Sequence, residues 1–146
     1  TSYKIIDKLY DASISGVKIN MIVRGVCCLI PGIKGLSENI RVISVVDKFL
    51  EHSRIFSFHN GGDLRVYLSS SDLMTRSLDN RVEVTFPIYD KHIINQVMET
   101  FKISWEDNVK SRNVNGKNHN SFVSKSSKKS VRSQWEIYDY FKSHMK

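Results

Sequence analysis

The sequence has no long apolar run and little cysteine. Its longest stretch without a charged residue is nine residues long, 25–33, whereas a membrane-spanning helix needs about twenty apolar residues. We therefore expect neither a transmembrane helix nor a signal peptide. The two cysteines, Cys27 and Cys28, are adjacent. This spacing suits neither a disulfide framework nor a zinc site built from C-x-x-C pairs, so we interpret both as structural thiols in a reducing cytoplasm.

Acidic residues are absent between residues 108 and 134, although this segment holds seven of the 22 basic residues. These seven are Lys110, Arg112, Lys117, Lys125, Lys128, Lys129 and Arg132. Outside the segment the basic residues equal the 15 acidic ones in number, so the whole net charge of +7 arises there. Ser and Asn are abundant and apolar residues are scarce, which is typical of a chain that does not order itself. We predict a mobile basic loop or linker at 108–129; the alternative is a surface that attracts a polyanion.

The sequence also lacks the Walker and G-x-G-x-x-G patterns of nucleotide-binding loops. Its one glycine pair, Gly61-Gly62, indicates a hairpin turn instead. Four of the histidines have no partner at metal-ligand spacing, namely His59, His92, His119 and His144. We therefore predict no metal site in this segment of chain.

Hydrophobic periodicity predicts helices and strands that alternate along the chain. The predicted helices are 4–13, 43–51, 90–103 and 130–143, and the predicted strands are 17–24, 54–58, 65–70 and 81–86. Such alternation predicts an α/β (mixed α+β) domain with a mixed central sheet flanked by helices. At 146 residues the length fits one core. We divide the chain into a domain at 1–107, the basic segment at 108–129 and a C-terminal helix at 130–146 that packs on the domain.

Arg24, His52 and Arg54 are the strongest candidates for a functional site. Arg24 ends a predicted strand, and the other two lie between a predicted helix and the next strand. An arginine at the end of a buried strand keeps its charge and needs an anionic partner. That partner is either a phosphate or, in a structural role, Glu38 or Asp47. A histidine can donate a hydrogen bond or a proton to a phosphoryl oxygen near neutral pH, but at a helix end it can equally contact the helix dipole.

Several blocks of sequence carry a family resemblance. They are 22–29, 35–41, 49–54, 58–62, 66–72 and 76–83. In this order they resemble the C-terminal domain of bacterial polyphosphate kinases, the class related to phospholipase D. Collinear blocks are far more specific than one short motif, and these cover roughly the first ninety residues densely and the rest thinly.

The resemblance implies a phospholipase D-like fold and a part in polyphosphate synthesis. Enzymes of this family reversibly transfer the terminal phosphoryl group of ATP to inorganic polyphosphate through a phosphohistidine. In them the arginine and histidine of these blocks contact the phosphates of the nucleotide. This implies that Arg24 and His52 bind ATP and that His52 supports catalysis as an acid or phosphate contact. The phosphorylated histidine and the arginines that hold Mg²⁺ lie in the preceding domain of these enzymes, so we expect the isolated chain to be inactive.

Further candidate contacts to polyphosphate are Arg54, Ser69, Ser71, Arg76 and Arg81. The serines belong to the run 69–72, which follows a predicted strand. Hydroxyl and backbone N–H groups there can line a phosphate pocket or simply form a turn. Among the arginines we expect one structural pair, such as Arg81 with Asp79 or Glu83.

Two other functions remain open. His52-Ser53-Arg54 is similar to the His-x-Lys motif of the phospholipase D superfamily, which favours a phosphodiesterase half. That motif requires Asp four residues beyond its Lys, however, and here Phe58 occupies this position. The basic segment favours instead a non-enzymatic module that binds polyanions or nucleic acid. As a kinase, the protein would have ATP or ADP, inorganic polyphosphate and the remaining domains of its polypeptide as partners, in a homo-oligomer located in the cytoplasm or at a membrane surface.

Overall fold

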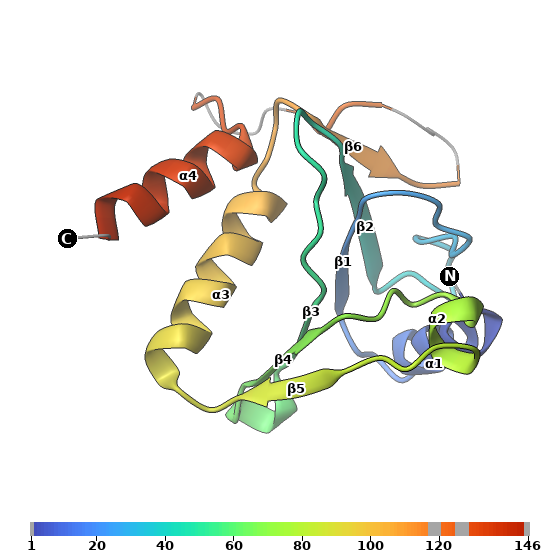
Figure 1. The fold of residues 1–146 in the computed structure, drawn as a ribbon. Coiled ribbons are helices and arrows are strands. Elements are labelled where there is room, and N and C mark those ends of the chain that lie inside the picture. The colour runs from blue at the N-terminus through green and yellow to red at the C-terminus, as the bar shows by residue number, and fades with distance from the viewer. Residues whose placement is uncertain (1, 117–120, 125–128, 145–146) are drawn as a thin grey trace.

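The computed structural model describes residues 2–116, 121–124 and 129–144 (Figure 1). Within these ranges the chain forms two three-stranded sheets and four α-helices. The helices are α1 (Tyr3–Ile14), α2 (Thr75–Asp79), α3 (Lys91–Trp105) and α4 (Ser133–His144). The strands are β1 (Ile19–Val23), β2 (Ile40–Val45), β3 (Ile55–Phe58), β4 (Arg65–Ser69), β5 (Thr85–Ile88) and β6 (Ser111–Val114).

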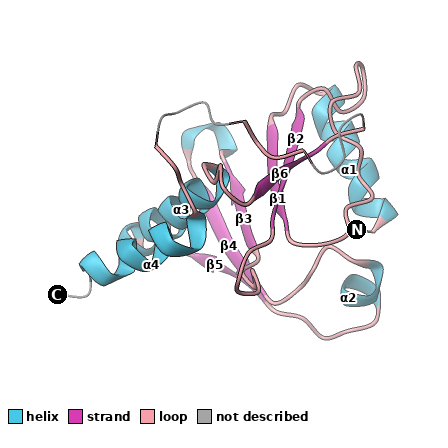
Figure 2. Cartoon of the chain, turned by 90° about the horizontal axis from the view of Figure 1, so that it is seen from above, coloured by secondary structure: helices cyan, strands magenta, loops and turns pink. Residues whose placement is uncertain are grey.

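The first sheet is mixed and has β2 at its centre. β1 runs parallel to β2, and β6 runs antiparallel to it on the other edge. Alternate residues of a strand point to opposite faces. Ile40 and Val42 of β2 share one face and pack with Ile6 and Leu29 in the buried core. Helix α1, which contributes Ile6, therefore covers this face, and it lies beside the sheet in both Figure 1 and Figure 2.

The second sheet is an antiparallel meander of β3, β4 and β5. A single 3₁₀ turn, η1 (Asn60–Gly62), joins β3 to β4. Gly61 and Gly62 have φ angles of 64° and 100° there, which residues with a side chain rarely adopt. The hairpin predicted from this glycine pair is confirmed. After β5 the chain enters α3, and α4 then lies next to α3 (Figure 2).

The predicted fold class is confirmed, since helices flank small sheets in a mixed α/β domain. Helices α1, α3 and α4 correspond to the predicted helices 4–13, 90–103 and 130–143, and strands β1, β3 and β4 to the predicted strands 17–24, 54–58 and 65–70. The predicted strand 81–86 begins too early, because β5 starts only at Thr85. In the described ranges, every helix is too short or too polar to cross a membrane.

The helix predicted at 43–51 is wrong. Residues 40–45 form β2, and a loop leads from there to β3. The apolar residues of β2 are buried, whereas Phe49 and Leu50 of the supposed inner helix face are exposed. A run of β-branched residues fits the spacing of a helix as well as that of a strand. Here the segment forms a strand because β1 and β6 pair with its two edges.

The segment 108–129 is also not a loop throughout, because β6 lies inside it. Ser111 of β6 pairs with Val45 of β2 and is fully buried, and Arg112 bridges to Phe122. The backbone of β2 forms hydrogen bonds with β6 on the side away from β1, and the polar composition of the segment did not reveal this pairing. Polar residues are common in edge strands such as β6. Lys117, Lys125, Lys128 and His119 lie outside the described residues.

Candidate functional site

Arg24 and Arg54 lie together around one carboxylate, that of Asp72, and His52 contacts Arg54. Arg24 follows β1, Arg54 precedes β3 and Asp72 follows β4. The Asp72 Oδ1 atom is 3.1 Å from Nη2 of Arg24 and 3.0 Å from Nε of Arg54. We call these four residues the Asp72 cluster. Three segments that are distant in sequence thus converge at one place.

Arg24 makes its second contact with the backbone just before His52. Its Nη1 donates a hydrogen bond of 2.8 Å to the carbonyl oxygen of Glu51. The structural partner expected for Arg24 was Glu38 or Asp47, and this expectation is wrong, because the ion pair forms with Asp72. The Arg24 side chain keeps 28% of its surface exposed, so it is not sealed inside the protein.

Arg54 contacts both the backbone and the side chain of His52. Its Nη1 donates a hydrogen bond of 3.0 Å to the carbonyl oxygen of His52. The same atom lies 3.2 Å from Nδ1 and 3.4 Å from Nε2 of the imidazole. His52 is exposed and lies in the loop between β2 and β3 rather than at a helix end. The helix-dipole interpretation of His52 is therefore wrong, and its imidazole faces solvent beside a cation.

The electrostatics of the Asp72 cluster favour an anionic ligand. The hydrogen bond from Arg54, together with the charges of Arg54 and Arg24, lowers the pKa of Asp72 below its ordinary value despite partial burial. Asp72 is therefore ionised at neutral pH. One carboxylate then balances only one of two guanidiniums, which leaves a net positive charge next to an exposed histidine. Phosphate and carboxylate groups are the anions that such charge-assisted donors bind well.

Helix α4 braces the loop that carries His52, a role that the sequence did not reveal. The Gln134 amide donates to the carbonyl oxygen of Phe49 at 2.8 Å and to Oε1 of Glu51 at 2.7 Å. It also accepts from the backbone N–H of Phe49 at 3.0 Å. Next to it, Arg132 forms two hydrogen bonds of 2.7 Å with the buried carboxylate of Asp47. Arg132 just before α4 and Gln134 in its first turn thus fix the chain at two points before His52.

The hydroxyl groups of Ser69 and Ser71 are used in local bonds. The Ser69 hydroxyl lies 2.7 Å from that of Thr85 and accepts from the backbone N–H of Ser71 at 3.0 Å. The Ser71 hydroxyl donates to the carbonyl oxygen of Asp72 at 3.0 Å. These bonds favour the turn interpretation of the serine run, and contact with polyphosphate stays a prediction.

Arg76 and Arg81 are not brought into the Asp72 cluster. Arg76 is exposed on α2, and Arg81 lies 4.0 Å from the carboxylate of Glu83. The structural pair expected for Arg81 is therefore confirmed. Among the described residues, no hydrogen bond or ion pair joins either arginine to Asp72.

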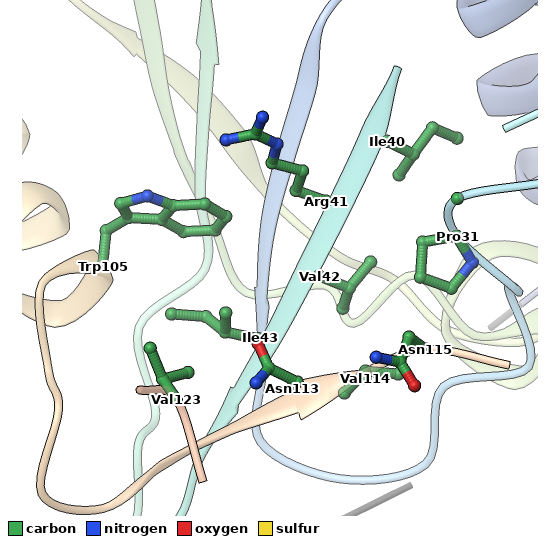
Figure 3. A pocket seen from close by; sticks show the side chains of 11 residues that line it. Pro31, Ile40, Arg41, Val42, Ile43, Trp105, Asn113, Val114, Asn115 and Val123 are labelled. Atoms are coloured by element: carbon green, nitrogen blue, oxygen red, sulfur yellow. The ribbon is translucent and has the colours of Figure 1, made fainter. Parts of the chain in front are cut away.

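A separate hollow of about 310 Å³ lies beside β2 and β6 of the first sheet (Figure 3). Trp105 at the end of α3, Arg41 and Ile43 of β2 and Asn113 of β6 are among the residues that line it. Its lining is mainly apolar and contains none of the cluster residues. The hollow is therefore distinct from the candidate site.

The cysteines and the acidic residues form no metal centre in the described ranges. There, no group of three or more His, Cys, Asp or Glu side chains lies close enough together to hold a metal ion. Cys27 is half-buried, Cys28 is exposed and both are free thiols.

Known proteins similar to this chain agree with the resemblance of its sequence blocks. The family described as "Polyphosphate kinase C-terminal domain 2" matches residues 1–134. The polyphosphate kinase of Vibrio parahaemolyticus is 51% identical over 138 residues, and that of Escherichia coli strain K12 is 48% identical over 139 residues. The alignments cover 94% and 95% of this chain but only 20% of each relative. The chain thus spans about a fifth of the length of these relatives.

The crystal structure of polyphosphate kinase from Porphyromonas gingivalis is similar to the whole fold. It matches 99% of this chain with a TM-score of 0.94 and 42% sequence identity, and 22% of that protein is covered. Its phospholipase D-like fold agrees with the fold expected for this chain. The chain therefore belongs to the family of polyphosphate kinase C-terminal domains.

Proposed function

We propose that this chain is the part of a polyphosphate kinase that binds phosphate groups of ATP through Arg24 and His52. The main support is the Asp72 cluster, in which Arg24 binds the carbonyl oxygen of Glu51 and Arg54 binds that of His52. Two guanidiniums and an exposed imidazole thereby share one surface region around a single carboxylate. A triphosphate carries several negative charges and accepts many hydrogen bonds, so it suits this region.

In the proposed reaction, a histidine upstream of this chain takes the terminal phosphoryl group from ATP and releases ADP. The same phosphoryl group then passes to the terminal oxygen of a polyphosphate chain, and both steps are reversible. Charge on the phosphoryl oxygens must be stabilised while bonds to phosphorus break and form. Arg24 holds the transferring phosphoryl group or the β-phosphate. His52 donates a hydrogen bond, and in its acid form a proton, to a phosphate oxygen.

Mg²⁺ enters the proposal through the family, which generally uses it. The described residues offer no fitting metal site, because their acidic side chains and histidines do not gather in threes and two guanidiniums occupy Asp72. We therefore assign the protein ligands of Mg²⁺ to the rest of the polypeptide. ATP or ADP, inorganic polyphosphate and those remaining domains are the partners in this proposal.

The comparisons favour the kinase over the two alternatives. Relatives that match 94–95% of the chain carry the name polyphosphate kinase. The phosphodiesterase alternative lacks support at Arg54. The phospholipase D motif has its Asp four residues after the Lys, whereas the carboxylate that binds Arg54 belongs to Asp72, after β4. The nucleic-acid alternative depends on the basic segment, part of which pairs as β6 inside the first sheet.

Substitution of the two phosphate-binding residues in the complete kinase tests the proposal. We expect Arg24→Ala and His52→Ala each to slow polyphosphate synthesis from ATP at least roughly tenfold, since a lost charge-assisted contact costs on the order of 1.5–3 kcal/mol. Arg24→Lys should recover only part of the rate, because an ammonium keeps the charge but not the two-pronged geometry of a guanidinium.

The matched control is Arg65→Ala, which removes an exposed arginine that forms an ion pair with Asp63 in the β3–β4 turn region. It should leave the synthesis rate unchanged. Wild-type rates in both Arg24→Ala and His52→Ala would refute the proposed phosphate contacts.

A further inference from the structure

Asp72 is the common partner of two arginines whose positive charges would otherwise repel each other. Its Oδ1 accepts from Nη2 of Arg24 and from Nε of Arg54, and its Oδ2 lies 3.4 Å from Nη2 of Arg24. Among the described residues, Asp72 is the acidic side chain with which these arginines form ion pairs. The close approach of the two guanidiniums therefore depends on this one carboxylate.

The contact is partly shielded from water. The exposed fractions of the side chains are 28% for Arg24, 27% for Asp72 and 18% for Arg54. Ion pairs with this degree of burial hold their geometry better than fully exposed pairs, which solvent and salt screen strongly. Removal of the carboxylate would leave two neighbouring cations without their shared counter-charge.

The remaining donors of both arginines determine where His52 lies. Arg24 binds the carbonyl oxygen of residue 51, and Arg54 binds that of residue 52. Both carbonyl contacts come from guanidiniums that Asp72 also holds. The position of His52 relative to Arg24 is thus linked to Asp72 through two separate hydrogen-bond paths.

We propose that Asp72 is a positioning residue for phosphoryl transfer, which holds Arg24 and Arg54 so that Arg24 and His52 meet the same phosphate group. This inference rests on the proposed function of Arg24 and His52. Asp72 itself touches neither ATP nor polyphosphate in this arrangement. A role as a general base is disfavoured, because the lowered pKa makes its carboxylate a weak base and both guanidiniums already occupy it.

The first test compares Asp72→Asn with wild type in the complete kinase. Asparagine keeps the size of the side chain and one acceptor oxygen but removes the charge. We expect kcat for polyphosphate synthesis to fall about tenfold while KM for ATP changes less than about threefold. The two constants should respond differently because loss of the negative charge favours binding of the ATP anion, whereas arginines without their shared carboxylate are poorly placed for phosphoryl transfer. Asp63→Asn, at an exposed ion pair outside the cluster, is the control and should change neither constant.

The second test is a double-mutant cycle that separates positioning from a merely structural role. In the background of Arg24→Ala with Arg54→Ala, we expect Asp72→Asn to lower kcat by less than about twofold, because the groups it positions are gone. Thermal unfolding of every variant is measured in parallel. An equal loss of kcat in both backgrounds, or a loss explained by a smaller folded fraction, would overturn the inference.

The outcomes also separate this inference from the proposed function. If Arg24→Ala is slow and Asp72→Asn has the wild-type kcat, Asp72 has no positioning role although the phosphate site stands. If Arg24→Ala itself has the wild-type rate, the proposed function fails first and the inference fails with it.

Discussion

At the scale of single residues, three carboxylates fix the chain around the candidate site. Asp47 binds Arg132, Asp72 binds Arg54 and Arg24, and Asp107 binds backbone N–H groups. The pKa of Asp47 and that of Asp72 are lowered chiefly by hydrogen bonds from arginine. Burial raises the pKa of Asp107, but hydrogen bonds from Ser133, Lys110 and Val109 outweigh it and lower the pKa overall.

Asp107 is a residue whose substitution should reduce stability substantially. Its carboxylate is 1% exposed and accepts bonds of 2.7–3.0 Å from the backbone N–H groups of residues 109–111 and 133 and from the Ser133 hydroxyl. It thereby ties the end of α3 to β6 and α4. We expect Asp107→Asn to lower the free energy of unfolding by about 2–4 kcal/mol at pH 7, because buried donors lose their acceptors.

This effect should depend on pH in a defined direction. The folded-state pKa of Asp107 is lowered, so its contribution is complete above the unfolded pKa of about 3.9 and is lost as pH falls through the folded value. Urea unfolding of the 146-residue chain across this range should show wild type approaching Asp107→Asn in strongly acid solution. Asp79→Asn, at an exposed position, serves as the control. A stability difference that stays constant with pH would contradict the assignment.

At the scale of elements, α4 and the loop between β2 and β3 act together. Gln134 in the first turn of α4 binds residues 49 and 51 of this loop, and Arg132 just before α4 binds residue 47. The loop has no regular secondary structure of its own, so these contacts limit its motion. The helix therefore helps to set the position of His52 indirectly, because the hydrogen bonds of Gln134 go to Phe49 and Glu51.

Gln134→Ala tests this bracing. The substitution removes three hydrogen bonds to the loop, and we expect polyphosphate synthesis by the complete kinase to slow by about threefold to tenfold through misplacement of His52. Gln96→Ala on α3, at a half-buried position whose amide contacts the His92 ring one turn earlier, should have no effect. Equal rates in the two variants would show that the loop holds its position without α4.

The sequence predicted the elements that depend on neighbouring residues and missed the contacts between residues that are distant in sequence. Alternating periodicity and turn glycines identified α1, β1, the β3–β4 hairpin and α3, because neighbouring residues decide these elements. The strand β2 was misassigned because its partners β1 and β6 lie far away in sequence. The same reason hid the pairing of Asp72 with Arg24, which is 48 residues away, and that of Gln134 with Glu51, which is 83 residues away. The family blocks pointed to Arg24 and His52, but pairing across such distances requires the fold.

At the scale of the whole molecule, the chain corresponds to one part of a polyphosphate kinase. It spans 20% of the relatives named polyphosphate kinase and 22% of the similar crystal structure. The Asp72 cluster offers two guanidiniums and one imidazole, which can bind and orient phosphate but supply no phosphorylated histidine in our proposal. In the proposed function, the active site of the complete kinase combines this surface with residues elsewhere in the polypeptide.

The most direct test of this account is the structure of the complete kinase with a non-hydrolysable ATP analogue. The account predicts that phosphate oxygens of the analogue lie within about 3.2 Å of a guanidinium nitrogen of Arg24 and of a ring nitrogen of His52. Asp72 should still bridge Arg24 and Arg54 in that complex. A triphosphate bound elsewhere, with Arg24 and His52 both facing solvent, would contradict the central claim.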